Sequence, residues 1–302
     1  MKPNQLRALV AIAEHGSIHA AARALCLTQP AVTKAIHELE AHLGLSLLNR
    51  QSRGVTFTEP GRVVLARARL IVREFERVQE EVGLLKGTSA GRLMIGVTPL
   101  AGLTVLPKAF QQFRAVCPDI ELNFLEFSAD KLDEHLRCGT LDFAVGALPD
   151  LRRHTATKNR HLLSLPTSLA VRRGSPLCDC RSLAQLQKAE WLHTEVSSHF
   201  ELFLAELFQQ HGLPPPRRIT RCSSQSLFLS LALEADVVIF WSQFSLLLPA
   251  LREQLSPLQL DTVLPHLGLH LMQREDGLLT PSAEYFIRCI EQVAAEAREA
   301  QI

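Results

Sequence analysis

The chain of 302 residues lacks a long apolar segment. No apolar run approaches the roughly 18–20 uninterrupted residues that a membrane-spanning helix needs. Glu14 and His15 interrupt the apolar stretch near the start, so that stretch does not resemble a signal peptide. The seven cysteines are odd in number and scattered, which argues against a disulfide framework. Cys178 and Cys180 fall short of CxxC spacing, and we interpret them as part of a surface turn. We therefore predict a cytoplasmic protein with no membrane contact.

Motifs of catalysis and metal binding are also missing from the sequence. There is no GxSxG elbow, GxxxxGK[ST] loop, GxGxxG fingerprint or HExxH helix. His135 with Cys138, and His266 with His270, lack further partners at the spacing that a metal site requires. We therefore predict that the protein is not an enzyme and has no catalytic residues, metal site or cofactor.

Neither sign of charge is in excess, because 32 basic and 31 acidic residues give a net charge of +1. This balance argues against a protein coated in positive charge, such as a histone-like DNA packer. The distribution is uneven, however. Met1 to Arg73 holds ten basic and four acidic residues, a net charge of +6, and the remainder carries −5. A basic head on an acidic body favours contact with a polyanion, although a solvated basic helix surface would give the same count.

The basic segment begins with a pattern typical of three short helices. The first helix has an apolar stripe at Leu6, Leu9, Val10 and Ala13. Gly16 ends it, and Ser17 is a good N-cap for an alanine-rich helix over 18–25. Thr28 then caps a third helix, with Pro30 in the first turn, where proline is tolerated. Two short helices joined by a tight turn predict a helix-turn-helix.

The third predicted helix has two different faces. Its apolar stripe consists of Val32, Ile36, Leu39 and Leu43. The opposite side groups Pro30, Thr33, Lys34 and His37, with Gln29 at the N-terminal end. Short polar and basic side chains suit base edges and phosphates in a DNA major groove. An ordinary exposed face would more often pair Glu with Lys, whereas Glu38 and Glu40 lie to the sides. We therefore favour DNA binding.

Two further elements follow the third helix. Strands at 47–50 and 55–57, joined by a turn that ends at Gly54, predict a wing. Arg50 and Arg53 can then contact phosphate or the minor groove. Thr58 caps a long helix whose apolar residues are spaced alternately by four and three: Val64, Ala68, Ile71, Phe75, Val78, Val82 and Leu85. This heptad seam predicts a helix pair between two copies, although packing against the chain's own body remains an alternative.

Several short motifs occur together within residues 1–61. They are Gly16-Ser17, Ala20-Ala21-Ala22-Arg23, Leu27-Thr28-Gln29-Pro30-Ala31-Val32-Thr33, Ile36, Leu39-Glu40, Leu43-Gly44, Leu47-Leu48, Arg50, Arg53-Gly54-Val55 and Thr58-Glu59-Pro60-Gly61. The run Thr-Gln-Pro-Ala-Val-Thr after an Ala-Ala-Arg helix is highly specific. On these motifs the chain resembles LysR-type transcriptional regulators, and its length and organisation extend the resemblance over the whole chain. Lys34 stands where Arg is frequent, and Leu48 and Asn49 stand where Phe and Glu are frequent. These departures concern operator preference or wing packing.

The resemblance implies specific roles and partners. In this family the third helix enters the major groove, and the DNA-binding residues expected here are Ser17, Thr28, Gln29, Pro30, Ala31, Thr33, Lys34, His37, Arg50, Arg53 and Thr58. The expected partners are double-stranded operator DNA, a small-molecule effector, RNA polymerase and further copies of the chain in a tetramer built as a dimer of dimers. The expected domains are a winged helix-turn-helix over 1–58 with its motif at 18–37, a linker helix over 59–87, and an effector-binding domain over 92–302.

The predicted fold class is α/β, with a mostly α-helical N-terminal domain and a two-lobed α/β body that resembles periplasmic binding proteins. Strands alternating with helices indicate parallel sheets. Strands are expected at 93–97, 120–124, 141–145, 163–171, 218–221, 237–240 and 267–272. Helices are expected up to Leu106-Pro107 and near 109–116, 132–136, 200–211, 225–233 and 282–297. Lobe I is expected to contain 92–164 and 268–302, and lobe II 165–267.

Three turns that follow strands carry small hydroxyl groups and suggest an effector site. They contain Thr98 before Pro99, then Ser128, and then Ser223 with Ser224. A hydroxyl with free backbone N–H groups at a helix start suits a small organic anion, although each alone would be explained by N-capping. The expected apolar walls are Leu100, Ala101, Phe127, Phe143 and Phe240. We predict a regulator controlled by an anion between the lobes; the alternative is a ligand-independent regulator or architectural protein with a vestigial cleft.

Overall fold

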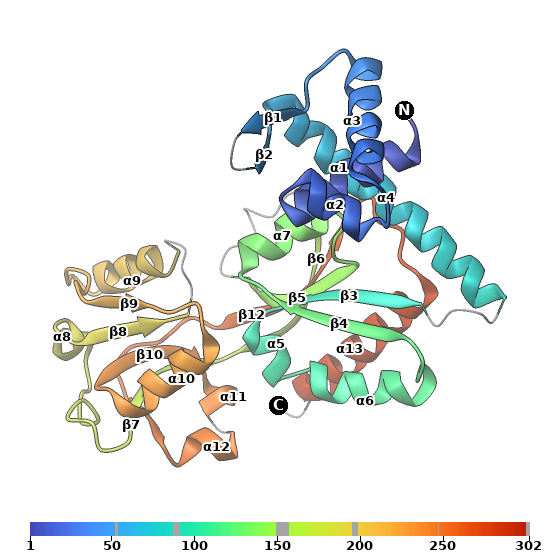
Figure 1. Ribbon diagram of the computed structural model, residues 1–302. Coiled ribbons are helices and arrows are strands. Elements are labelled where there is room, and N and C mark those ends of the chain that lie inside the picture. The colour runs from blue at the N-terminus through green and yellow to red at the C-terminus, as the bar shows by residue number, and fades with distance from the viewer. Residues whose placement is uncertain (52–53, 87–90, 149–156, 195–198, 247, 300–302) are drawn as a thin grey trace.

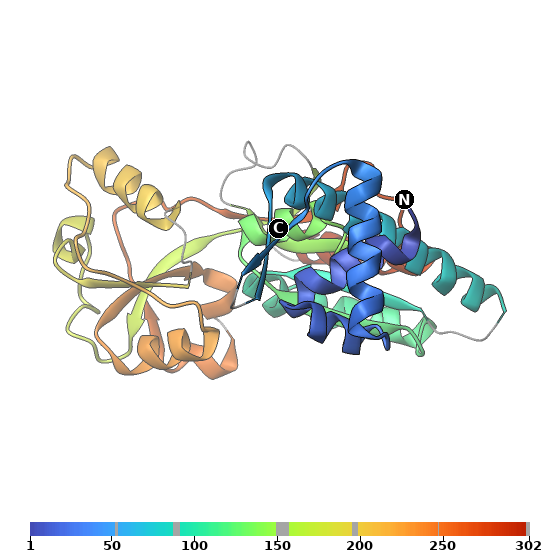
Figure 2. The same cartoon turned by 45° about the horizontal axis from the view of Figure 1, so that its top comes forward.

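The computed structural model describes residues 1–51, 54–86, 91–148, 157–194, 199–246 and 248–299. A helical N-terminal unit lies over one of two sheet-based lobes, and the second lobe lies to the side (Figure 1). The view in Figure 2 shows the same arrangement from another direction. No helix among the described residues is long and apolar enough to cross a membrane.

The N-terminal unit is a winged helix-turn-helix. Its elements are α1 (Pro3–His15), α2 (Ile18–Ala24), α3 (Gln29–Leu43), β1 (Leu48–Gln51) and β2 (Gly54–Phe57), with the two strands antiparallel. Gly16 ends α1 in the left-handed conformation, with φ of 72°, which a residue without a Cβ adopts at little cost. Ala21 and Ala22 of α2 are buried against a common core with Val32 and Ile36 of α3, so small residues allow the helices to approach closely.

The long helix α4 (Glu59–Leu85) follows the wing. The Thr58 hydroxyl accepts a hydrogen bond from the Gly61 N–H at 3.0 Å, as expected of an N-cap. The predicted apolar seam is shorter than the heptad pattern suggested. Ala68 is 1% exposed and Val64 is half-buried, because both pack into the core that α4 shares with α1. The burial of Ala68 removes it from a seam between two copies, whereas the place of Val64 in the seam stays a prediction.

Lobe I is a five-stranded sheet in the order β4-β3-β5-β12-β6, covered by helices. Its elements are β3 (Arg92–Val97), α5 (Pro99–Leu103), α6 (Leu106–Val116), β4 (Glu121–Glu126), α7 (Ala129–Arg137), β5 (Phe143–Leu148), β6 (Thr157–Leu165), β12 (Leu267–Arg274) and α13 (Pro281–Glu299). β3 is parallel to β4 and β5, whereas β12 is antiparallel to β5 and β6. The predicted parallel arrangement thus holds for β4, β3 and β5, whereas β12, which enters the sheet from the other lobe, is antiparallel to its neighbours.

Lobe II is a second five-stranded sheet in the order β11-β7-β10-β8-β9. Its elements are β7 (Thr167–Arg172), α8 (Leu183–Leu186), β8 (Glu190–His193), α9 (His199–Gln210), β9 (Ile219–Arg221), α10 (Gln225–Glu234), β10 (Val237–Ser242), α11 (Gln243–Leu246), α12 (Pro249–Arg252) and β11 (Leu255–Pro257). The parallel strands are β9, β8 and β10, and β7 is antiparallel to β10.

Proline explains two differences between the expected and observed elements. The predicted strand over 163–171 is two strands, β6 and β7, separated by Pro166, which has no N–H to continue a ladder. Pro107 lies in the first turn of α6 instead of ending the helix before it, since a proline there removes no helical hydrogen bond. The chain thus changes lobes at Pro166.

Candidate nucleic-acid interface and ligand site

The outer face of α3 is free of contacts with the core beneath it. Gln29, Pro30, Ala31, Lys34 and His37 are exposed, while the apolar stripe of the same helix is buried. The Lys34 side chain is 79% exposed, and its Nζ lies 4.0 Å from Glu38 Oε1, so solvent screens this pair strongly. Thr33 is half-buried beside them. His37 Nδ1 lies 3.6 Å from Glu40 Oε2, so the acidic residues are not separate from this face as the sequence argument assumed. The face presents a cation, an amide and an imidazole on one helix.

Three of the predicted DNA-binding hydroxyls already have a role in the fold. The Ser17 Oγ accepts from the Ala20 N–H at 3.1 Å, and the Thr28 Oγ1 accepts from the Ala31 N–H at 3.4 Å. The Thr58 hydroxyl donates to the Ser46 carbonyl at 2.7 Å in addition to capping α4. These residues thus set where α2, α3 and α4 begin.

The wing can be described only in part. Arg50 lies in β1, where it pairs with Val55 of β2. Arg53 lies outside the described residues, so its predicted role stays a prediction.

A row of apolar side chains lies on the outer surface of α4. Ile71, Phe75, Val78 and Val82 are 37%, 42%, 58% and 42% exposed. They recur every three or four residues, so they share one face of the helix. A large part of each of these four apolar side chains is therefore exposed to solvent. The backbone of Leu85 lies in the last turn of α4.

The opposite side of α4 is fixed to lobe I by buried charges. An Arg77 nitrogen lies 2.6 Å from Asp142 Oδ1, with side chains 8% and 3% exposed, and Arg73 approaches the same oxygen at 3.5 Å. Arg77 also donates to the Leu278 carbonyl at 3.2 Å. The second oxygen of Asp142 accepts from the Met94 N–H of β3 at 2.7 Å. One carboxylate therefore joins the linker helix to the lobe I sheet.

The carboxyl ends of the parallel strands in both lobes lie at the junction between the lobes. In lobe I, β12 enters at Leu267, and its second residue Gly268 pairs with Leu148 at the end of β5. In lobe II, Thr167 at the start of β7 pairs with Ser242 at the end of β10. Both crossovers thus join the sheets at their carboxyl edges, where open α/β sheets bind ligands.

The predicted effector residues lie at these edges but differ in their surroundings. Thr98 follows β3 and is 8% exposed. Its Oγ1 accepts from the Ala147 N–H at 3.1 Å, so it ties β3 to β5 and does not cap α5. Pro99 opens α5, which is only five residues long. Ser128 is exposed and makes no cap bond to α7.

Lobe II contributes the remaining predicted hydroxyls. Ser223 and Ser224 are exposed at the start of α10, and the Ser224 Oγ accepts from the Leu227 N–H at 3.3 Å. Ser224 therefore has the capping role that was weighed against ligand binding, and the exposed Ser223 lies two residues after the end of β9.

The expected apolar walls belong largely to the cores. Phe143 is fully buried, and its ring meets that of Phe286 edge to face at 6.0 Å, so its assignment as a wall is wrong. Leu100 and Ala101 are 5% and 0% exposed in the same lobe I core. Phe127 is half-buried and its ring stacks on that of His135, with 4.3 Å between the ring centroids. In lobe II, the ring centroids of Phe240 and Phe203 are 4.7 Å apart. An apolar residue near a polar turn has the same sequence pattern whether its side chain packs in a core or lines a cleft.

Comparison with known proteins separates the chain into two matched regions. Residues 3–62 match the bacterial regulatory helix-turn-helix protein domain of the lysR family, and residues 86–295 match the LysR substrate binding domain. The chain belongs to the LysR family of DNA-binding transcriptional regulators.

Named relatives agree with this family. The chain is 28% identical to the HTH-type transcriptional regulator GbpR of Azospirillum brasilense over 268 residues, which cover 88% of this chain and 77% of that protein. It is 28% identical to the HTH-type transcriptional regulator GalR of Pseudomonas putida over 293 residues, covering 97% and 74%. It is 30% identical to the SDS degradation transcriptional activation protein of a Pseudomonas species over 238 residues, covering 78% and 76%.

Solved LysR-family structures share the fold. ArgP from Mycobacterium tuberculosis superposes with a TM-score of 0.72 at 20% identity, covering 96% of each chain. Full-length CbnR complexed with its target DNA has a TM-score of 0.66 at 22% identity, covering 97% of this chain and all of that one. The likeness extends from the winged helix-turn-helix to both lobes.

Two polar residues of this LysR-family chain that the sequence analysis did not select lie at the lobe II edge. Arg221 ends β9 and forms an ion pair with Glu201 of α9. His193 ends β8, and its ring stacks on Phe200 with 3.6 Å between centroids. For Arg221, the available signal was a basic residue at a strand end, two positions before Ser223.

Proposed function

We propose that an organic anion bound at the lobe junction controls this LysR-family regulator. The observation that carries the proposal is the meeting of both carboxyl edges at the two crossovers, with Thr98 on the lobe I side. A ligand that contacts both edges favours one angle between the lobes and shifts the population toward it.

The polar groups at the junction support an anionic effector. The Thr98 Oγ1 already accepts from the Ala147 N–H, so its own proton is oriented to be donated. Ser128 and Ser223 add exposed hydroxyls at the start of helices, where backbone N–H groups favour negative charge. Arg221 lies on the lobe II side, with Glu201 as its ion-pair partner.

A change of lobe angle can reach the DNA through α4. Arg73 and Arg77 hold the linker helix against Asp142 of lobe I, so lobe I and α4 move together. The exposed row from Ile71 to Val82 is where a second copy pairs, and each partner then supplies one α3 to a half-site. Two such pairs form the tetramer that we propose, which acts on RNA polymerase in the cytoplasm and has no catalytic activity.

The test of the effector site is Thr98→Val, which keeps the shape of the side chain and removes its hydroxyl. Screening small mono- and dicarboxylic acids by thermal shift identifies an anion that stabilises the wild type, since binding to the folded state raises its stability. The Thr98→Val variant should lose most of that shift and still retain operator DNA in a gel.

The matched control is Thr104→Val. In the wild type, the Thr104 hydroxyl donates to the Leu100 carbonyl. It should keep the full thermal shift. A full thermal shift in Thr98→Val would contradict the effector site. If no acid in the screen changes the behaviour of the wild type or of its DNA complex, the regulator is ligand-independent.

A further inference from the structure

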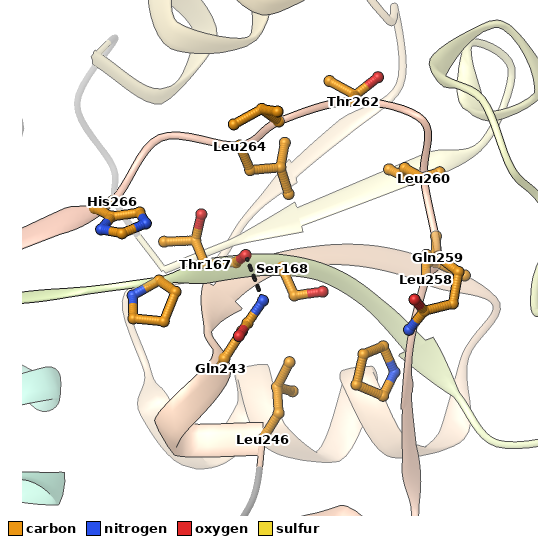
Figure 3. Close-up of a pocket in the computed structure, with 13 residues that line it drawn as sticks. Thr167, Ser168, Gln243, Leu246, Leu258, Gln259, Leu260, Thr262, Leu264 and His266 are labelled. Atoms are coloured by element: carbon orange, nitrogen blue, oxygen red, sulfur yellow. Dashed lines mark hydrogen bonds between the residues drawn. The ribbon is translucent and has the colours of Figure 1, made fainter. Parts of the chain in front are cut away.

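A cavity of about 490 Å³ lies in lobe II beside the crossovers and has a mixed lining (Figure 3). Gln243, Gln259 and His266 bring polar groups, and Leu260 and Leu264 bring aliphatic surface. Donors and acceptors together fit acidic and neutral ligands alike, so this lining identifies no ligand class. The base of the wing in the N-terminal unit is held, in contrast, by bonds whose donors and acceptors are defined.

The base of the wing, residues 46–48, is held from the side of α3 by one carboxylate. Glu40 Oε1 accepts from the Leu47 N–H at 2.7 Å and from the Leu48 N–H at 3.2 Å. Leu47 is 0% exposed and Leu48 is 9% exposed, so loss of this acceptor would leave buried donors behind. Glu40 lies in the last turn of α3, where the helix dipole disfavours a negative charge. The two N–H donors offset that cost.

The same base is held from the side of α4. The Thr58 hydroxyl donates to the Ser46 carbonyl at 2.7 Å, and the Thr58 N–H donates to the Leu47 carbonyl at 3.0 Å. Gly61 lies so close that a Cβ there would overlap the Leu47 carbonyl. β1 begins at Leu48, so the wing starts from a segment fixed between α3 and the start of the linker helix.

The two acidic residues in this part of α3 have different partners. The second oxygen of Glu40, Oε2, lies 3.6 Å from His37 Nδ1 on the outer face of the helix. Glu38 Oε2 accepts from the Gln5 side-chain amide of α1 at 3.1 Å, and its Oε1 lies 4.0 Å from the Lys34 Nζ. Glu40 therefore joins the outer face of α3 to the wing, whereas Glu38 joins it to α1.

We propose that Glu40 is a positioning residue for DNA binding, which fixes the wing relative to α3. This role requires an acceptor oxygen at the full length of the side chain, and it does not require the negative charge. The wing carries Arg50 and Arg53, which are predicted to contact phosphate. The inference rests on the DNA binding of the LysR family and on that predicted contact, and it is independent of the effector proposed for the lobe junction.

Four variants of the full chain separate the length of the side chain from its charge. Glu40→Gln keeps the length and an acceptor oxygen without the charge. Glu40→Asp keeps the charge but is one methylene too short, and Glu40→Ala removes both. Glu38→Ala is the matched control, because it removes a charge from the same helix at a residue whose partners are Gln5 and Lys34. Circular dichroism during heating identifies the temperature at which all variants are folded.

DNA affinity is measured by fluorescence anisotropy on a duplex that the wild type selects from a random-sequence library, between about 50 and about 200 mM salt. Glu40→Gln and Glu38→Ala should bind within about threefold of the wild type, with the same slope of log affinity against log salt. Glu40→Asp and Glu40→Ala should bind at least about tenfold more weakly. Their slope should be smaller by about 1–2, because each lost phosphate contact removes about 0.9 from it.

Three results overturn the proposal. The first is wild-type affinity and slope in Glu40→Asp, because the length of the side chain would then be irrelevant. The second is weak binding in Glu40→Gln or in Glu38→Ala, which would assign the effect to lost charge. The third is weaker binding of Glu40→Asp with the slope of the wild type, which would place the effect on α3 instead of the wing.

Discussion

Replacing Asp142 by asparagine tests how lobe I holds the linker helix. The substitution keeps the shape of the side chain and removes the charge that faces Arg77 at 2.6 Å and Arg73 at 3.5 Å. If the new amide oxygen keeps the bond from the Met94 N–H, its NH₂ group turns toward Arg77. Two buried guanidinium groups then face a donor instead of a carboxylate.

The magnitude follows from burial and from the partners that remain. Breaking a buried ion pair by removing one member costs about 3–5 kcal/mol. Arg77 keeps the ion pair with Glu74 at 2.8 Å and Arg73 keeps that with Glu76 at 3.3 Å, and the two glutamate side chains are 40% and 41% exposed. These contacts compensate in part, so we expect a loss near the lower bound, about 3 kcal/mol.

Urea unfolding followed by circular dichroism measures the loss, and hydrogen exchange shows where it arises. In Asp142→Asn, amide hydrogen exchange should be faster than in the wild type in residues 92–97 and in the part of α4 around Arg77. The control is Glu296→Gln at the pair between Lys108 and Glu296, whose side chains are 59% and 40% exposed. It should cost less than about 1 kcal/mol and lose that effect in high salt, whereas the Asp142→Asn effect should persist.

A double-mutant cycle with Arg77→Met isolates the pair. A coupling energy of about 2 kcal/mol or more is expected for contacting buried charges. If Asp142→Asn behaves like the exposed control and the coupling is near zero, the carboxylate does not hold α4 on lobe I.

Three further predictions concern DNA binding, assembly and pH. Thr33→Ala combined with Lys34→Ala should abolish operator retention in a gel shift, and unchanged retention would refute the role of α3. Phe75→Glu with Val82→Glu should split the oligomer in sedimentation, because charge enters the apolar row; an intact dimer would place the interface elsewhere. Burial lowers the pKa of His135, so the unfolded chain binds a proton more readily, and stability should fall as pH drops from about 7 to about 5. A His135→Gln variant should show a smaller drop in urea unfolding; an equal drop would assign it to other groups.

Much of the N-terminal unit could be predicted because local signals there agree with one another. Caps at Ser17 and Thr28, a glycine at position 16 and an apolar stripe from Val32 to Leu43 each act over a few residues. Several strands and helices of the lobes were likewise located to within a few residues, but β8, which lies between β10 and β9 in the lobe II sheet, was not predicted. Pro166 and Pro107 were present in the sequence, but whether a proline divides or begins an element depends on its neighbours in space.

The two sheets show where local patterns stop being sufficient. An apolar strand such as β12 has the same sequence pattern in a parallel or an antiparallel position, and only its return from lobe II decides the direction. Phe143 was assigned to a cleft wall as an apolar neighbour of the hydroxyl-bearing turns, yet the tertiary structure places its ring against that of Phe286 in α13. Ala68 fits a heptad seam by spacing, but α1 covers it.

The sequence by itself determined the family, the helix-turn-helix and the division into a basic arm and an acidic body, since these depend on motifs and charge along the chain. Only the tertiary structure decided that Asp142 meets Arg77 of α4, because that contact joins residues 65 positions apart. It also decided that the Thr167 hydroxyl donates to the Pro265 carbonyl, 98 positions later in the chain. Such contacts depend on how the elements pack, and the pattern within each element does not encode them.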